Sequence, residues 1–300
     1  MSYQEPDNES PAAGGAEAAG AENRSGGEAI PEGLWIKCSQ CGEMLYQPEL
    51  QEELHVCRHC GHHRRLTARE RIAITADEES FREHDADMRT SDPLHFPGYR
   101  EKLSEDEART GLKEALVWGE CTIEGIPVVL AVMDFSFRGG SMGAVVGEKF
   151  ARAAERAIER GAPLVLFACS GGARMQEGIV SLLQMAKTTT VVSRLARERA
   201  PFVVIYTDPL TAGVFASFAS VADVAIAEQN ALVGFAGPRV IEKAFNIKLP
   251  AGSHTAEFQL EHGMVDMVVA RRGLRPLLVR LLGLLSPHRT EDVAAEGPLP

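Results

Sequence analysis

The sequence predicts an α/β fold preceded by a small metal-binding module, and three observations indicate it. From about residue 121 onward, apolar runs rich in Val, Ile and Leu alternate with stretches of helical periodicity. Nearer the N-terminus, four cysteines form two Cys-x-x-Cys pairs. Glycine-rich turns follow several of the apolar runs. The 300 residues, of which 45% are hydrophobic, suffice for one large domain or two smaller ones.

Charge and hydropathy exclude some classes of protein. Lys and Arg number 31 against 42 Asp and Glu, for a net charge of −11, which argues against coating nucleic acid through bulk charge. No apolar run approaches the ~20 residues that span a bilayer. The start, Met1 to Asp7, has neither the basic region nor the apolar stretch of a secretory signal. We therefore expect no membrane partner and a cytoplasmic location.

Composition divides the chain into four parts. Residues 1–31 are rich in Ala, Gly, Glu and Ser and bury too little apolar surface to offset their ordering entropy, so we expect a disordered acidic tail. Residues 287–300 predict a second disordered tail. Between them we expect a zinc ribbon at 32–63 and the α/β domain at 64–286.

The cysteine spacing is Cys-x2-Cys-x15-Cys-x2-Cys, which is typical of a zinc ribbon. Four thiolates saturate a tetrahedral Zn²⁺, so we expect one structural zinc with no open position for water. The predicted ligands are Cys38, Cys41, Cys57 and Cys60. A redox dithiol would need only one pair. Four histidines at 55–63 lie among arginines at 58–71, and this basic patch predicts either contact with a phosphate, a nucleic acid or an acidic partner, or simply a solvated face.

The expected elements of the α/β domain follow in chain order. Thr67 is the expected N-cap of a short helix, and a second helix is expected over 103–116. Apolar periodicity predicts a helix over 147–160, ended by Gly161, and a longer helix over 175–199. The expected strands are 126–133, 164–168, 202–206, 224–227 and 265–269.

Glycine turns at strand ends are the candidate ligand site. The turn Ser170-Gly-Gly-Ala-Arg174 joins a strand to the long helix, where unpaired amides suit an oxyanion hole, although a plain tight turn is the alternative. Turns at 137–143, 208–213 and 234–239 would meet at the same sheet edge. None matches a dinucleotide or NTP motif. No histidine lies between His95 and His254, so chemistry there would need backbone electrostatics, a cofactor or a second chain.

Ordered motifs from about residue 35 to 285 make the sequence resemble the carboxyltransferase β subunits of the multi-subunit acetyl-CoA carboxylases of bacteria and plastids. They are the cysteine ribbon with Cys57-Arg-His-Cys60-Gly-His-His63, then Gly139-Gly-Ser-Met-Gly143, Ser170-Gly-Gly-Ala-Arg-Met-Gln-Glu177, Thr207-Asp-Pro209, Gly234-Phe-Ala-Gly-Pro-Arg-Val-Ile241 and Glu257-Phe-Gln-Leu-Glu-His-Gly-Met-Val-Asp266. The resemblance implies a crotonase-like fold, a superhelix of stacked ββα units.

The resemblance also implies a reaction and its partners. The carboxyl group of carboxybiotin, held on a biotin carrier protein, would pass to acetyl-CoA and give malonyl-CoA for fatty-acid synthesis. An α subunit would complete the active site in an α2β2 assembly, and biotin carboxylase would join the larger complex. The biotin itself would take the α-proton, which accounts for the missing base.

Site residues carried over from the resemblance are of two kinds. Gly171 and Gly172 are expected to bind the enolate oxygen of the acetyl thioester. The substrate-binding set comprises Gly139, Gly140, Gly143, Ala173, Arg174, Gly213, Gly234, Phe235, Ala236, Gly237 and Arg239. Within it, Arg174 and Arg239 are candidates for the phosphates of coenzyme A, with a salt bridge that braces the turn as the alternative.

Some positions depart from the family pattern. Ala212 stands where Gly is usual, Phe215 replaces a small hydroxyl residue, Arg138 a Met and Ala144 a Ser, and the loop 249–254 also differs. Ala212 adds a Cβ at a turn that is expected to demand positive φ. Two alternatives stay open: a carboxyltransferase for another acyl-CoA, such as propionyl-CoA, and a zinc-ribbon protein that binds nucleic acid.

Overall fold

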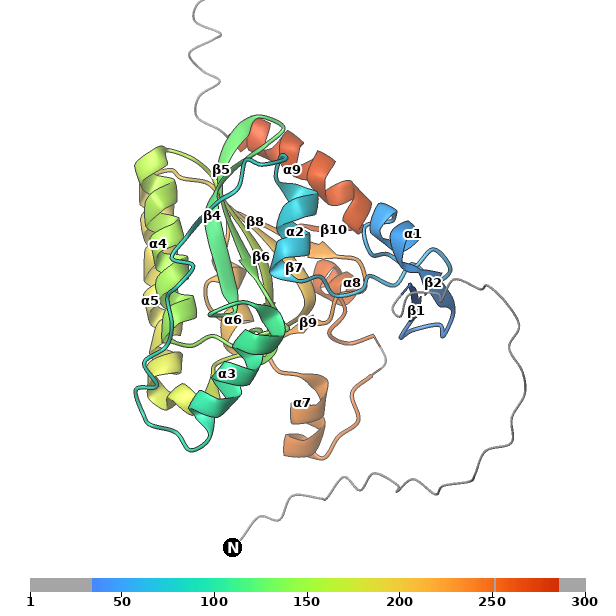
Figure 1. Ribbon diagram of the computed structural model, residues 1–300, viewed down its shortest axis with the longest axis horizontal. Coiled ribbons are helices and arrows are strands. Elements are labelled where there is room, and N and C mark those ends of the chain that lie inside the picture. Colours follow the sequence, from blue (N-terminus) through green and yellow to red (C-terminus); the bar gives the residue numbers. More distant parts are fainter. Residues whose placement is uncertain (1–33, 251, 286–300) are drawn as a thin grey trace, which may run out of the picture.

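A computed structural model describes residues 34–250 and 252–285 (Figure 1). Both predicted disordered tails, 1–31 and 287–300, lie outside the described residues. The described chain forms a small N-terminal ribbon and a large sheet covered by helices. No helix in the described ranges is long and apolar enough to cross a membrane.

The large sheet has eight strands in the order β10-β8-β7-β6-β5-β4-β3, and β9 pairs with β7. Pairing is parallel from β5 to β10 and antiparallel among β3, β4 and β5. Strands β6 and β7 are almost wholly buried because helices cover both faces of the sheet. The strands are β3 (Arg82–His84), β4 (Leu116–Ile123), β5 (Ile126–Met133), β6 (Leu164–Ser170), β7 (Phe202–Thr211), β8 (Val224–Glu228), β9 (Val233–Gly234) and β10 (Met267–Val269).

Helices pack on both sides of this sheet. Figure 1 shows α4 and α5 side by side on one side, with α2 and α9 toward the other. The helices of this domain are α2 (Ala68–Thr75), α3 (Tyr99–Thr110), α4 (Ala144–Arg160), α5 (Gly178–Arg197), α6 (Ala212–Phe215), α7 (Pro238–Phe245), α8 (Ala256–Glu261) and α9 (Arg271–Leu285), with short 3₁₀ turns η1 (Arg138–Gly140), η2 (Met175–Glu177) and η3 (Ala219–Val221).

Most expected elements of the domain are confirmed, with one clear error. Thr67 caps α2 as expected, since its hydroxyl accepts from the Glu70 amide at 3.2 Å and the Glu70 carboxylate accepts from the Thr67 amide at 2.7 Å. The helix expected over 103–116 was wrong at its end. Gly111, at φ 70°, ends α3, and Leu116 already begins β4. Strand β4 escaped prediction because Gly119 and Glu120 interrupt its apolar pattern.

The ribbon has a very small core. Strands β1 (Trp35–Lys37) and β2 (Met44–Tyr46) pair antiparallel, and α1 (Gln47–Glu52) follows. In the part of the ribbon that the structure describes, its buried cluster consists of Cys38, Leu45, Leu50 and Cys57. A core of this size does not stabilise a fold alone, so the ribbon needs another source of stability.

A buried ion cluster fastens the ribbon to the domain. The Arg271 guanidinium donates to both oxygens of Glu228, at 2.8 and 2.9 Å, and also to the carbonyl of Leu54 in the ribbon at 3.0 Å. Arg71 lies 2.8 Å from the same carboxylate. Burial alone would raise the pKa of Glu228, but these two cations hold it well below its usual value, so the cluster stays ionised.

Candidate active site and metal centre

The four ribbon cysteines form one cluster. Their sulfur atoms all lie within 4.8 Å of one another, and the Cys38–Cys60 and Cys41–Cys57 pairs are each 3.8 Å apart. A tetrahedral zinc with bonds of about 2.3 Å places its ligand sulfurs about 3.8 Å apart. The four thiols therefore fit the predicted structural Zn²⁺, and no histidine between residues 34 and 285 that the structure describes belongs to the cluster.

The basic patch near the ribbon is mostly paired with carboxylates. Arg58 contacts Glu49, Arg65 contacts Asp208, Arg69 contacts Glu83, and Arg71 is buried against Glu228. Charges that are already paired within the chain attract a polyanion weakly. These pairings favour a solvated face held by internal ion pairs over a surface that binds nucleic acid.

The predicted glycine turns do meet at one edge of the sheet, and two of them interlock. The Gly171 amide donates to the Gly139 carbonyl at 2.9 Å, and the Met142 amide donates to the Gly172 carbonyl at 2.8 Å. Gly140 must be glycine, because a Cβ there would lie 2.6 Å from the Cys169 carbonyl oxygen. The loop 138–143 thus packs directly on the turn that follows β6.

These contacts contradict the assignment of Gly171 and Gly172 as the oxyanion pair. The Gly171 amide is bound to a carbonyl, and the Gly172 amide donates to Ser170 Oγ at 2.9 Å. Both donors hold the turn together and do not point at open space. Spacing alone could not reveal this, because the acceptor of Gly171 belongs to a loop about 30 residues earlier.

Two other backbone amides lie beside this turn: that of Ala173, which follows Gly172, and that of Gly213, near the start of α6 after β7. Neither donates to any acceptor in the ranges that the structure describes. A Cβ on Gly213 would lie 3.4 Å from the Ala173 nitrogen, so the two turns touch at this point. Gly213 lies in the first turn of α6, where amides lack helical partners. The arrangement brings two unpaired donors together at the predicted ligand edge.

The family departures near this point have structural explanations. Ala212 has φ 54°, which confirms the positive φ expected at this turn. Its methyl group would lie 2.7 Å from a Cβ on Gly172, so position 172 must lack one. Phe215 faces the core and packs edge-on against Tyr206 at 5.8 Å. Arg138 pairs with Asp106 at 3.3 Å.

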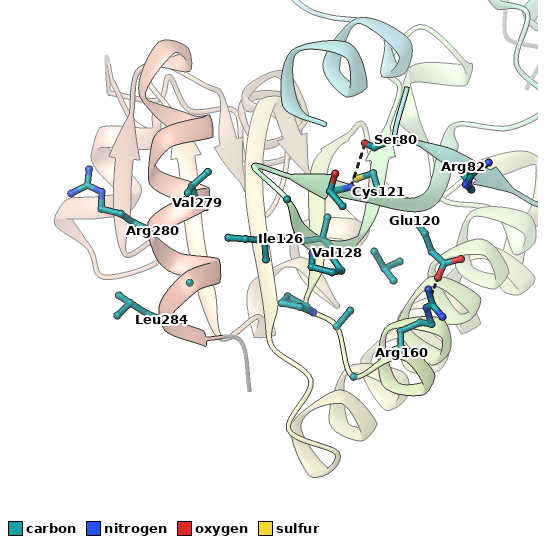
Figure 2. Close-up of a pocket in the computed structure, with 18 residues that line it drawn as sticks. Ser80, Arg82, Glu120, Cys121, Ile126, Val128, Arg160, Val279, Arg280 and Leu284 are labelled. Carbon is teal, nitrogen blue, oxygen red and sulfur yellow. Dashed lines mark hydrogen bonds and ion pairs between the residues drawn. The ribbon is translucent and has the colours of Figure 1, made fainter. Parts of the chain in front are cut away.

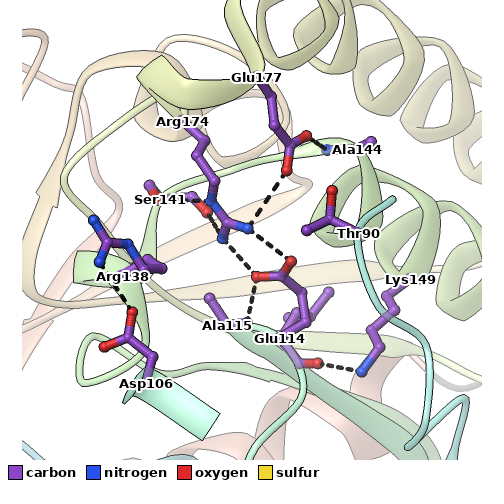
Figure 3. Close-up of polar contacts among 12 residues, drawn as sticks. Thr90, Asp106, Glu114, Ala115, Arg138, Ser141, Ala144, Lys149, Arg174 and Glu177 are labelled. Carbon is purple, nitrogen blue, oxygen red and sulfur yellow. Dashed lines mark hydrogen bonds and ion pairs between the residues drawn. The ribbon is translucent and has the colours of Figure 1, made fainter. Parts of the chain in front are cut away.

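Arg174 is a brace and not a ligand for coenzyme A phosphates, which corrects the first of its two expected roles. Only 1% of its surface is exposed, and it binds both oxygens of Glu114, at 2.5 and 2.7 Å (Figure 3). It also donates to the Ser141 carbonyl at 2.6 Å. Burial would lower the pKa of Arg174, but Glu114 raises it above the ordinary value, so the charge is retained.

Glu177 completes the brace, a role that the sequence motif ending at this residue did not reveal. Its carboxylate accepts from the Tyr99 hydroxyl at 2.7 Å and from the Ala144 amide at 2.6 Å. A Cβ on Gly143 would lie 2.6 Å from the same carboxylate, which explains that glycine. Burial raises the pKa of Tyr99, so its phenol keeps the proton that it donates. Tyr99, Glu114 and Glu177 escaped prediction because they converge from separate segments.

The turn after β9 holds the remaining predicted residues. Gly234 pairs beside Thr211, and a Cβ on it would lie 2.1 Å from the His254 ring. Phe235 is 71% exposed, Ala236 is half-buried, and a Cβ on Gly237 would meet no atom within 4 Å. Arg239 lies in α7, and its side chain falls outside what the structure describes.

Comparison with known families defines the class first. Residues 62–270 match the carboxyl transferase domain family, and residues 35–60 match the acetyl-CoA carboxylase zinc finger domain. The chain is therefore a carboxyltransferase with a zinc ribbon. The relative from Desulforamulus reducens is 56% identical over 85% of this chain and 88% of its own; one from Thermus thermophilus is 53% identical over 87% and 92%. Both are named acetyl-coenzyme A carboxylase carboxyl transferase subunit beta, and the chain belongs to that family.

Solved structures confirm the crotonase-like α/β fold. The transcarboxylase 12S core, with methylmalonyl-coenzyme A and methylmalonic acid bound, superposes with a TM-score of 0.63 at 29% identity over 78% of this chain. This chain spans 42% of that protein's length. One chain of the Pseudomonas malonate decarboxylase MdcD–MdcE heterodimer gives a TM-score of 0.58 at 26% identity, covering 76% of this chain and 93% of its own.

Proposed function

We propose that the chain transfers the carboxyl group of carboxybiotin to acetyl-CoA and forms malonyl-CoA, the precursor for fatty-acid synthesis. The names of the relatives support this substrate pair. The observation that carries the proposal is the meeting of the unpaired Ala173 and Gly213 amides at the sheet edge. Two preorganised donors stabilise charge that develops on a thioester oxygen, which carboxyl transfer to an acyl thioester requires.

In this proposal the two amides bind the acetyl oxygen as it becomes an enolate oxygen. Carboxybiotin, when bound, supplies the carboxyl group and the base that removes the α-proton. The amides of Gly171 and Gly172 hold the turn, and the Arg174–Glu114 pair fixes the backbone on the far side of Ala173. Among the described residues, no side chain is needed as a proton acceptor.

An α subunit is the proposed partner, since apolar side chains remain uncovered near the turns. Met175 is 84% exposed, and Ile179, Leu182 and Leu183 on α5 are also exposed. Near α7 the exposed apolar residues are Phe235, Val240, Phe245 and Ile247. Exposed apolar groups at this density indicate a protein interface. The related malonate decarboxylase chain is part of a heterodimer, which agrees with pairing at such a surface.

The rest of the assembly belongs to the same proposal. We propose an α2β2 carboxyltransferase that works with a biotin carboxyl carrier protein and biotin carboxylase in the cytoplasm. The alternatives have less support. Phe215, the departure that could alter acyl preference, is buried against Tyr206, and the basic patch that would bind nucleic acid is mostly paired with carboxylates.

The decisive experiment is the reverse reaction. Malonyl-CoA decarboxylation with a free biotin derivative is measured for this chain alone, for the α subunit alone and for the mixture. We expect activity only in the mixture, because the site is shared. Full activity of the isolated chain would contradict the shared site, and propionyl-CoA as the better acceptor in the forward assay would contradict the substrate.

A further inference from the structure

A cavity of about 1040 Å³ (Figure 2) is lined by none of the residues of the substrate turns. Its walls are the β4–β5 hairpin, the loop that precedes β6 and the last turns of α9. Strand β6 begins at Leu164 beside this groove and ends at Ser170 beside the substrate turns. The two sites therefore lie at opposite ends of one strand.

The floor of the groove is apolar. Figure 2 shows Ile126 and Val128 on β5 facing the space between α9 and the α4–β6 loop. Val279 and Leu284 line the α9 side, and Leu284 is 81% exposed. An apolar cavity of this size exceeds what isolated surface hydrophobes produce and falls at the upper end of small-molecule sites, about 300–1,000 Å³.

The rim carries positive charge on a chain whose net charge is −11. Arg82, Arg160 and Arg280 line the groove, against the single carboxylate of Glu120. Arg160 lies 2.7 Å from Glu120, which also accepts from Arg156 at 3.1 Å. Neither Arg82 nor Arg280 has an acidic partner within residues 34–250 and 252–285. The rim therefore has two cations without counter-ions.

We propose that this groove binds a long-chain carboxylate. The hydrocarbon chain lies along Ile126, Val128 and Val279, and the carboxylate is held by Arg82 or Arg280. Each additional buried methylene strengthens binding, so affinity grows with chain length. A cation beside an apolar floor selects a charged head over a neutral one. Binding here involves no residue of the acyl-transfer site and does not depend on the proposed reaction.

Calorimetric titration of the zinc-loaded chain with dodecanoate tests the site directly. We expect saturable 1:1 binding. Octanoate, with four fewer methylenes, should bind at least about tenfold more weakly because less apolar surface is buried. Methyl dodecanoate, which has the same chain but no charge, should also bind at least about tenfold more weakly. Absence of saturable dodecanoate binding, or equal binding of the methyl ester, overturns the proposal.

Variants locate the ligand. Val279→Glu places a carboxylate on the apolar wall and should abolish dodecanoate binding. The double variant Arg82→Gln/Arg280→Gln should weaken dodecanoate about tenfold and leave the methyl ester unchanged. Arg197→Gln, an exposed arginine on α5, is the matched control and should bind as the parent does.

The folded state and oligomeric state of each variant are checked by circular dichroism, zinc content and sedimentation. If Val279→Glu does not fold, the double variant and the comparison of dodecanoate with octanoate and methyl dodecanoate still test whether the groove binds a long-chain carboxylate. Unchanged dodecanoate affinity in the double variant overturns the carboxylate assignment. If the parent chain does not bind dodecanoate and the Val279→Glu variant loses an oligomeric state that the parent has, the groove is an interface between copies of the chain. That result also overturns the proposal.

Discussion

Two neighbouring turns at the same sheet edge use their backbone amides in opposite ways. In the turn after β6, the Gly171 and Gly172 amides both donate to acceptors within the chain. Where this turn meets the turn after β7, the Ala173 and Gly213 amides have no acceptor among the described residues. The two adjacent glycines, Gly171 and Gly172, therefore allow close backbone packing in the first turn. The unpaired amide donors belong instead to Ala173, one residue further on, and to Gly213 in the second turn. The four predictions below test this contrast, from the largest expected effect to the smallest.

The largest effect should come from breaking the brace under the first turn. Arg174→Gln leaves the Glu114 carboxylate buried without its cation, so we expect a loss of about 3–5 kcal/mol in the free energy of unfolding. Urea denaturation measures it. Arg197→Gln, at an exposed position, should change stability by less than about 0.5 kcal/mol. If both variants are equally stable, the buried pair does not hold the turn.

Blocking the unpaired donors should cost activity and leave the fold intact. A side chain in Gly213→Val would point at the Ala173 amide, and loss of one oxyanion donor typically lowers rate by about 10²–10³. The assay is malonyl-CoA decarboxylation by the complex with its α subunit, with assembly checked by gel filtration.

The matched control for this experiment is Gly171→Val, in the exposed part of the first turn. Because its amide already has an acceptor, we expect this variant to keep activity within about tenfold of the parent. The reverse ranking, with Gly171→Val inactive and Gly213→Val active, would restore the original pair.

Removal of a single hydroxyl should have an intermediate effect. Tyr99→Phe keeps the ring but leaves Glu177 without one donor, so we expect a loss of about 1–3 kcal/mol in unfolding free energy. Since Glu177 also holds the Ala144 amide, kcat should fall more than KM changes. An unaltered kcat would show that the brace is purely structural.

The smallest effect concerns backbone strain in the second turn. Ala212 has φ 54°, a region that costs a residue with a Cβ about 1 kcal/mol relative to glycine. Ala212→Gly should therefore raise stability by up to about 1 kcal/mol and retain activity. A lower melting temperature would show that the alanine methyl, which packs toward Gly172, contributes more than the strain costs.

Sequence reasoning found the elements whose signals are local. Apolar runs revealed β5 to β8 because buried parallel strands exclude polar residues. The Thr67 N-cap of α2 and the glycine stop of α4 were predicted correctly because each depends on residues within one turn. The strand β4 was missed because Gly119 and Glu120 interrupt its apolar pattern, although its partner β5 follows it directly in a hairpin.

For the site, the sequence predicted the metal ligands and the glycine turns, but it could not predict which backbone amides are free to donate a hydrogen bond. The spacing of Cys38, Cys41, Cys57 and Cys60 determined the zinc cluster, because four thiolates so spaced have few other uses. The motifs determined the family and which turns meet. Only the tertiary structure decided which amides are unpaired and that Arg174 is buried, because a hydrogen bond or an ion pair depends on partners brought from 30 or 60 residues away.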